Sequence, residues 1–105
     1  MIEGMVAGKV FGDPEARRGK GDSEFVVAKV RAQNNDAEVV IVNVIVFAAE
    51  LGAALLDLRD GDAVALVGSL SPKVWSDKQG NTRAALDMVA TRMLAAGVEQ
   101  KEEQR

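Results

Sequence analysis

The chain of 105 residues contains no cysteine, no histidine and no tyrosine, and its aromatic residues are one tryptophan and three phenylalanines. Without cysteine there can be no disulfide framework and no thiolate nucleophile, and without histidine the commonest general base is missing. Asp57, Asp60 and Asp62 lie close together in sequence, but a helix end and an Asp-Gly turn explain them without a metal. We therefore expect no enzymatic activity and no metal.

Long apolar runs are also absent. No segment approaches the roughly 18 apolar residues of a membrane helix, and the N-terminus lacks the basic and apolar regions of a signal peptide. We expect a cytoplasmic protein with no membrane partner. The net charge of -3 provides no general attraction for a polyanion, because phosphate binding is driven by Lys and Arg. The distribution of the cations must therefore decide whether nucleic acid can bind.

Apolar and polar residues alternate in five segments, which predicts strands over residues 3–11, 24–32, 38–47, 62–70 and 83–94. Between the third and the fourth, Leu51, Leu55 and Leu58 recur at helical spacing and predict a short helix over residues 48–58. The charged, glycine-rich segment 12–22 should be a mobile surface loop. We expect one domain over residues 1–97 and a polar, disordered tail over residues 98–105.

Three strands, a helix and two further strands are the order of the OB-fold, an all-β, five-stranded Greek-key barrel that often binds oligonucleotides. The third strand is apolar on both faces apart from Asn43. In a small antiparallel barrel, the second apolar face of such a strand usually needs a partner surface. The sequence therefore also predicts a homo-oligomer.

Trp75, the single tryptophan, lies in a basic and polar segment with Lys73, Lys78 and Arg83. An aromatic ring in such a hairpin suits base stacking, which is worth about 1–3 kcal/mol per base, while the cations follow the phosphates. Alternatively, the indole folds back and covers the end of the barrel. Composition does not decide between these two interpretations.

Phe47 ends the third predicted strand and, taken alone, suits the core better than a base-stacking position. The remaining candidates are cations in the first two strands and the loop between them: Lys9, Arg17, Arg18, Lys20, Lys29 and Arg31. They form one positive groove with the Trp75 segment if the barrel brings the two regions together. They form an ordinary solvated surface if the acidic residues among them, such as Asp13 and Glu24, pair with them.

Four segments follow one another at compatible spacings. The first is Val6 to Arg17, with a Gly-x-x-x-x-Asp-Pro-Glu-x-Arg pattern, and the second is Phe25 to Ala28. The third runs from Val44 through Phe47 to Asp62. The fourth comprises Val67 to Leu70 and a Trp-x-Asp-x-x-Gly hairpin that begins at Trp75. Together they resemble the bacterial single-stranded DNA-binding protein family, over about residues 4–96.

The resemblance implies that Trp75 and Phe47 stack on bases, and that Arg17 and Arg83 occupy basic groove positions. It also implies a homotetramer or a dimer, and a role in DNA replication, recombination or repair without a small-molecule substrate. Ile41 departs from the family, which often has a stacking tryptophan there, and this should weaken binding by about 1–3 kcal/mol. The acidic tail that recruits other enzymes in the family is absent before Arg105, so the chain resembles a divergent, tail-less member.

Two alternatives remain at this stage. One is a primosome component similar to primosomal replication protein N, which binds both DNA and protein. The other is an OB-fold that makes only protein contacts, with Trp75 buried and the groove cations held in ion pairs. The short length suggests a phage or mobile-element origin as an alternative to a bacterial chromosome.

Overall fold

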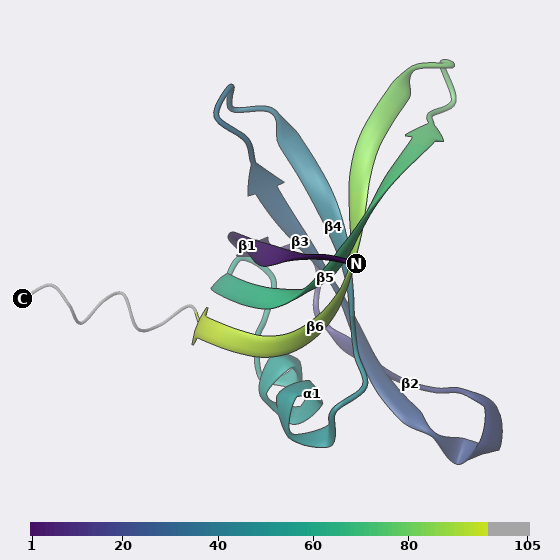
Figure 1. Ribbon diagram of the computed structural model, residues 1–105, viewed down its shortest axis with the longest axis vertical. Coiled ribbons are helices and arrows are strands. Elements are labelled where there is room, and N and C mark those ends of the chain that lie inside the picture. The colour runs from purple at the N-terminus through teal and green to yellow at the C-terminus, as the bar shows by residue number, and fades with distance from the viewer. Residues whose placement is uncertain (97–105) are drawn as a thin grey trace, which may run out of the picture.

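The computed structural model describes residues 1–96, which form six strands, one α-helix and one 3-10 turn (Figure 1). In chain order these are β1 (Ile2–Val10), β2 (Glu15–Arg18), the 3-10 turn η1 (Lys20–Asp22), β3 (Glu24–Gln33), β4 (Val39–Val46), α1 (Ala49–Leu56), β5 (Ala63–Ser76) and β6 (Thr82–Ala96). The predicted tail, residues 98–105, lies outside the described residues. Neither helical segment is long and apolar enough to span a membrane.

The strands form one sheet in the order β1-β5-β6-β4-β3-β2, and a further pairing of β1 with β3 closes it into a barrel. Neighbouring strands are antiparallel except β4 and β6, which run parallel. Five strands build the barrel, and α1 stands between β4 and β5 as the sequence predicts. The OB-fold is therefore confirmed.

Closure of the barrel depends on a close approach of β1 to β3. Lys9 pairs with Arg31 and Val10 with Val30 at the end of β1. At the residue before Lys9, a Cβ atom on Gly8 would lie 2.3 Å from the backbone oxygen of Arg31. Only glycine allows the two backbones to come this close.

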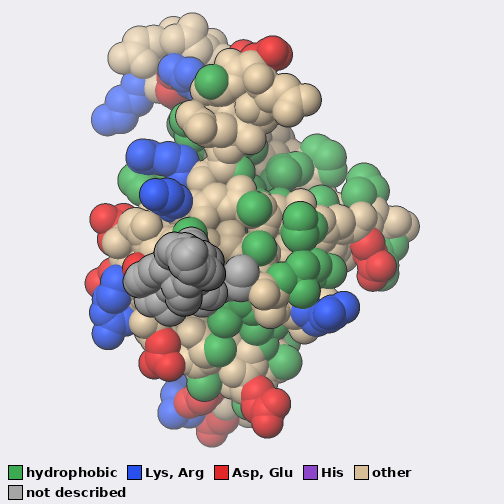
Figure 2. Space-filling view, turned by 90° about the vertical axis from the view of Figure 1, so that its left-hand side faces the viewer, with side chains coloured by type: hydrophobic (Ala, Val, Ile, Leu, Met, Phe, Trp, Pro, Cys, Tyr) green, Lys and Arg blue, Asp and Glu red, His purple; other side chains and the backbone are tan. Residues whose placement is uncertain are grey.

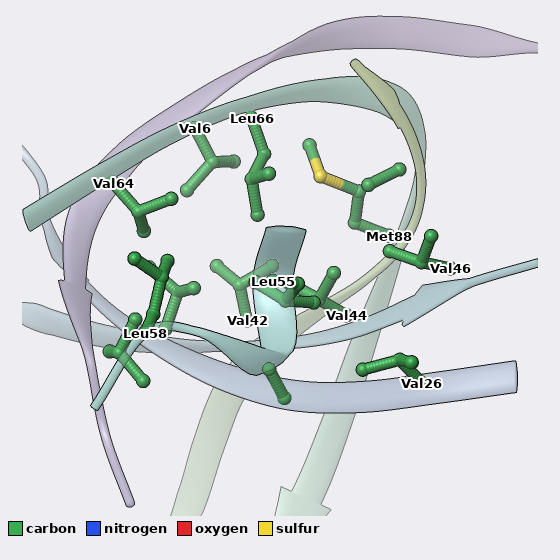
Figure 3. Packing of buried hydrophobic residues seen from close by; sticks show 14 residues of the cluster. Val6, Val26, Val42, Val44, Val46, Leu55, Leu58, Val64, Leu66 and Met88 are labelled. Atoms are coloured by element: carbon green, nitrogen blue, oxygen red, sulfur yellow. The ribbon is translucent and has the colours of Figure 1, made fainter. Parts of the chain in front are cut away.

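The core fills the barrel with the inward-facing residues of each strand. Val30, Val42 and Leu66 are fully buried, and Leu55 points from α1 into the same cluster (Figure 3). Each such side chain contributes about 1.5–3 kcal/mol through removal from water. The helix therefore seals one end of the barrel with its apolar side.

Two segments differ from the sequence-based expectation. Residues 15–18, expected in a mobile loop, form β2 and pair with Glu24 to Val27 of β3. All residues of β2 are exposed, so no apolar alternation marked this strand. The fourth predicted strand continues as β5 through Pro72 to Ser76. Pro72 lies beyond Leu70, the last β5 residue that pairs with β1, so β5 is an edge strand there and tolerates proline.

The β2–β3 hairpin projects at one end of the barrel, and two further hairpins project at the other end, as Figure 1 shows. One joins β3 to β4. The other, called here the β5–β6 arm, comprises residues 71–82, and its turn spans residues 77–81. Residues 71–76 of this arm are all exposed, so the arm stands away from the core.

Gly8→Ala should lower the free energy of unfolding by about 1–3 kcal/mol, the usual cost of overpacking, because the new Cβ meets rigid backbone. Gly4→Ala on the same strand is the matched control. Its Cβ would lie 3.1 Å from the Cδ1 atom of Leu70, a side-chain atom that can move. Urea denaturation of both variants measures the difference, and equal stabilities would show that closure does not require glycine.

Candidate nucleic-acid interface

The outward-facing side chains of β3, β4, β6 and β5 form the floor of an open groove of about 840 Å³, called here the first groove. The register places Lys29 opposite Asn43, Asn43 opposite Asp87, and Asp87 opposite Ser71. Arg17 of β2 and Lys73 of β5 also line it. Three of the predicted cations, Arg17, Lys29 and Lys73, therefore lie around one concave surface.

A carboxylate occupies the middle of this floor. The Nζ atom of Lys73 lies 2.8 Å from Oδ2 of Asp87, and Nδ2 of Asn43 donates a hydrogen bond of 3.3 Å to Oδ1. The hydrogen bond from Lys73 is the main cause that lowers the pKa of Asp87, against partial desolvation that raises it. The floor thus presents an ionised acceptor beside a cation, and it is not uniformly positive.

Trp75 lies on the β5–β6 arm opposite Arg83, with half of its surface exposed (50%). Alternate residues of a strand share a face, so Trp75, Lys73 and Ser71 all belong to the face that carries the first groove. Because residues 71–76 are exposed, the indole does not cover the barrel end. It presents a free aromatic surface above the groove.

The turn of the arm is organised by Asp77. Its Oδ1 atom accepts hydrogen bonds from the backbone N–H groups of Gln79 at 3.0 Å and Asn81 at 2.9 Å. Its Oδ2 atom pairs with the guanidinium of Arg83 at 3.2 Å. This network holds Arg83 beside Trp75, so the predicted groove cation also has a structural task.

Phe47 follows the end of β4, and 61% of its surface is exposed. The interpretation of Phe47 as a core residue is therefore wrong. Its ring centroid lies 6.1 Å from that of Phe25, with the planes tilted by 52°. Phe25 pairs with Arg17 of β2, so an aromatic pair and a cation meet beside the start of α1. The outward position follows from strand alternation, since Val46 next to it points into the core.

The other predicted cations do not all join the first groove. Arg18 is paired with Asp22 and Glu24 at the turn end of the β2–β3 hairpin. Lys20 lies in η1, and Lys78 lies in the turn of the β5–β6 arm. Lys9 and Arg31 line a second groove of about 680 Å³. The single continuous positive groove considered from the sequence is thus divided into two.

The outer face of β4 contributes to the first groove. Ile45 and Asn43 face outward and line it. Part of this face is therefore open to a ligand in the groove, and the subunit contact expected from its apolar residues stays a prediction. The sequence analysis also gave no role to Asn43, Asp87 or Ser71. Their signal was weak, because only the register of four strands brings these polar residues together.

A family model described as the single-strand binding protein family matches residues 1–96. The chain belongs to this family. No curated protein sequence is significantly similar to it. Within residues 1–96, no group of three acidic residues is arranged to hold a metal ion.

Solved structures share the fold of this family member at low sequence identity. The small single-stranded DNA-binding protein of Streptomyces coelicolor is 20% identical, with a TM-score of 0.62, and the alignment covers 89% of this chain and 92% of that one. The mitochondrial protein Rim1 of S. cerevisiae is 15% identical, with a TM-score of 0.62 and coverage of 88% and 91%. The Plasmodium falciparum SSB in complex with ssDNA is 17% identical, with a TM-score of 0.59 and coverage of 90% and 96%.

The Asp77 network predicts an acid-dependent change in the arm. The pKa of Asp77 is lowered from its ordinary value of 3.8, chiefly by the N–H of Asn81. A lowered folded-state pKa means that the stabilisation is complete above pH 3.8 and is lost as the pH falls through the folded value. Trp75 emission should therefore be constant near neutral pH and change as the pH falls below 3.8.

Asp77→Asn should abolish this transition, because the variant has no carboxylate to protonate there. Asp87→Asn is the matched control, since the pKa of Asp87 is also lowered but its side chain lies in the groove floor and not in the turn. If the transition survives in Asp77→Asn and vanishes in Asp87→Asn, the titrating carboxylate is that of Asp87 and the prediction is wrong.

Proposed function

We propose that this chain binds single-stranded DNA without sequence preference, with the strand lying across the first groove. Trp75 at one end and Phe47 at the other would stack on bases. The observation that carries the proposal is the exposure of both rings at opposite ends of one sheet face. Stacking accepts every base because each has a π face, so this arrangement supports sequence-independent binding.

The distance between the two rings supports an extended ligand. Trp75 lies opposite Arg83 in β6, whereas Phe47 aligns with about residue 91 of β6, two residues beyond the pair of Ile45 and Val89. Eight residues at 3.3 Å each correspond to roughly 26 Å along the strands. A nucleic acid that contacts both rings must therefore cross the whole groove.

The cations suit phosphates, but at modest strength. Arg17 and Lys73 are engaged in exposed ion pairs with Glu15 and Asp87, which are weak and can exchange for a phosphate. Lys29 has no carboxylate of residues 1–96 within ion-pair distance. With a net charge of -3, we expect binding that weakens steeply as salt rises.

The family and the exposed tryptophan favour DNA binding over an OB-fold used only for protein contacts. The proposed setting is replication, recombination or repair in the cytoplasm of a bacterial or phage-infected cell. The function needs no enzymatic chemistry and no cofactor, and its ligand is a polymer and not a small molecule.

Trp75→Ala should weaken oligo-dT binding by about 5- to 150-fold, which corresponds to the loss of 1–3 kcal/mol of stacking. The slope of affinity against salt should stay the same, because no phosphate contact is removed. Val74→Ala is the matched control, since Val74 is 72% exposed on the opposite face of the same arm. Anisotropy of a labelled oligo-dT at two salt concentrations measures all three proteins.

In the unmodified protein, Trp75 is the only tryptophan, so its emission reports directly on the ring. Oligo-dT should quench it. Unchanged emission at saturating oligonucleotide in low salt, together with equal affinities of the two variants, would favour the protein-contact function instead.

We also propose that the chain forms a homodimer or homotetramer through β1. This strand pairs with β3 only at Lys9 and Val10, so its other edge is unpaired over residues 2–8 within the described chain. The proposed contact uses residues 2–6, because Ala7 and Gly8 line the second groove. Apolar side chains at its start are exposed: Met1, Ile2 and Met5. Figure 2, which views the left-hand side of Figure 1, shows hydrophobic side chains gathered on one half of this face. An exposed edge beside an apolar patch favours association.

Met5→Glu should convert the oligomer into monomers, because it places a charge in the proposed contact. Val74→Glu adds the same charge on the β5–β6 arm and should leave the mass unchanged. Light scattering coupled to size-exclusion chromatography gives both masses. A monomeric unmodified protein would refute the proposal outright.

A further inference from the structure

Phe11 stands on the ridge between the two grooves. It follows β1 directly, and its side chain lines both the first groove and the second. The ring is 45% exposed and does not belong to the hydrophobic core cluster or to the apolar residues packed against it. The ring is therefore not part of the barrel core, and its exposed surface is available to a ligand.

The backbone around Phe11 is held on both sides. Its own N–H donates to the backbone oxygen of Lys29 at 2.8 Å, and the preceding carbonyl of Val10 accepts from Gly61 at 2.7 Å. After it, the N–H of Gly12 donates to Oδ1 of Asp60 at 2.7 Å. The N–H of Asp60 in turn donates to Oδ1 of Asp13 at 3.0 Å. The ring is thus presented from an ordered backbone, which lowers the entropy cost of binding.

Arg31 covers the ring with its guanidinium group, whose carbon lies 4.6 Å from the ring centroid of Phe11. Lys9 is the cross-strand neighbour of Arg31, and both cations line the second groove. Neither has a carboxylate of residues 1–96 within ion-pair distance. Asp60 is the acidic residue of this groove, and its Oδ1 atom is already occupied by Gly12.

We infer that a longer nucleic acid leaves the first groove over Phe11 and continues through the second groove. A base stacks on the pair formed by Phe11 and Arg31, because aromatic rings and guanidinium planes both accept base stacking. Lys9 contacts the phosphates beyond it. This inference rests on the proposed function and extends it with a third stacking position and a second binding segment.

The path predicts a dependence on oligonucleotide length. The affinity for oligo-dT should rise with length in two steps, as the first groove and then the second is filled. Phe11→Ala should remove the second step, with a loss of about 5- to 150-fold for long oligonucleotides that exceeds any loss for short ones. Phe11→Leu, which retains bulk without an aromatic ring, should behave in the same way, so a folding defect cannot be the cause.

Lys9→Gln provides an independent measurement. It should reduce the salt slope by about one for long oligonucleotides only, because a single phosphate contact is lost. A reporter variant adds a spectroscopic test. With Trp75→Phe and Phe11→Trp combined, the single tryptophan stands on the ridge, and its emission should be quenched more strongly by long than by short oligo-dT.

The outcomes separate this inference from the proposed function. If short oligo-dT quenches Trp75 but Phe11→Ala binds every length as the unmodified protein does, the second segment is refuted and the first groove stands. If no oligonucleotide quenches either tryptophan, both proposals fail together.

Discussion

The contact between β1 and β3 at Gly8 is the constraint on which the rest of the structure depends. It closes the sheet into a barrel, and a side chain at this position would collide with the backbone of Arg31. Closure buries one face of every barrel strand and turns the other outward as a groove. It also delivers Phe11, at the end of β1, to the backbone of Lys29. A more open sheet would separate the ridge from both grooves.

The charges of Lys73 and Asp87 balance each other in the first groove, whereas the cations of the second groove are not balanced in this way. Asp87 neutralises Lys73 in the first groove, while Lys9 and Arg31 in the second have no acidic partner among residues 1–96. A groove of this kind can bind a polyanion despite the acidic total, because affinity depends on the phosphates that each cation meets. The same balance limits attraction at a distance, so aromatic stacking must supply much of the affinity. The proposed affinity therefore depends largely on the exposed rings of Trp75, Phe47 and Phe11.

Sequence reasoning located the five barrel strands and the helix to within a few residues, apart from the extension of β5, because alternation and helical spacing are direct records of burial. It missed β2, because all residues of this strand are exposed and do not alternate between apolar and polar. It ended the fourth strand too early, because Pro72 and polar residues resemble a loop unless the unpaired edge is known. Phe11 was not among the predicted binding residues, since its place between two grooves depends on segments distant in sequence.

By itself, the sequence determined the family, the order of the strands, the short helix and the identity of Trp75 as a candidate stacking residue. These follow from residue types and spacings along the chain. Tertiary structure alone decided that Phe47 is exposed, that Asp87 sits between Lys73 and Asn43, and that the cations are divided between two grooves. The physical reason is register: it joins residues that lie far apart in the chain, and no local pattern records which of them will meet.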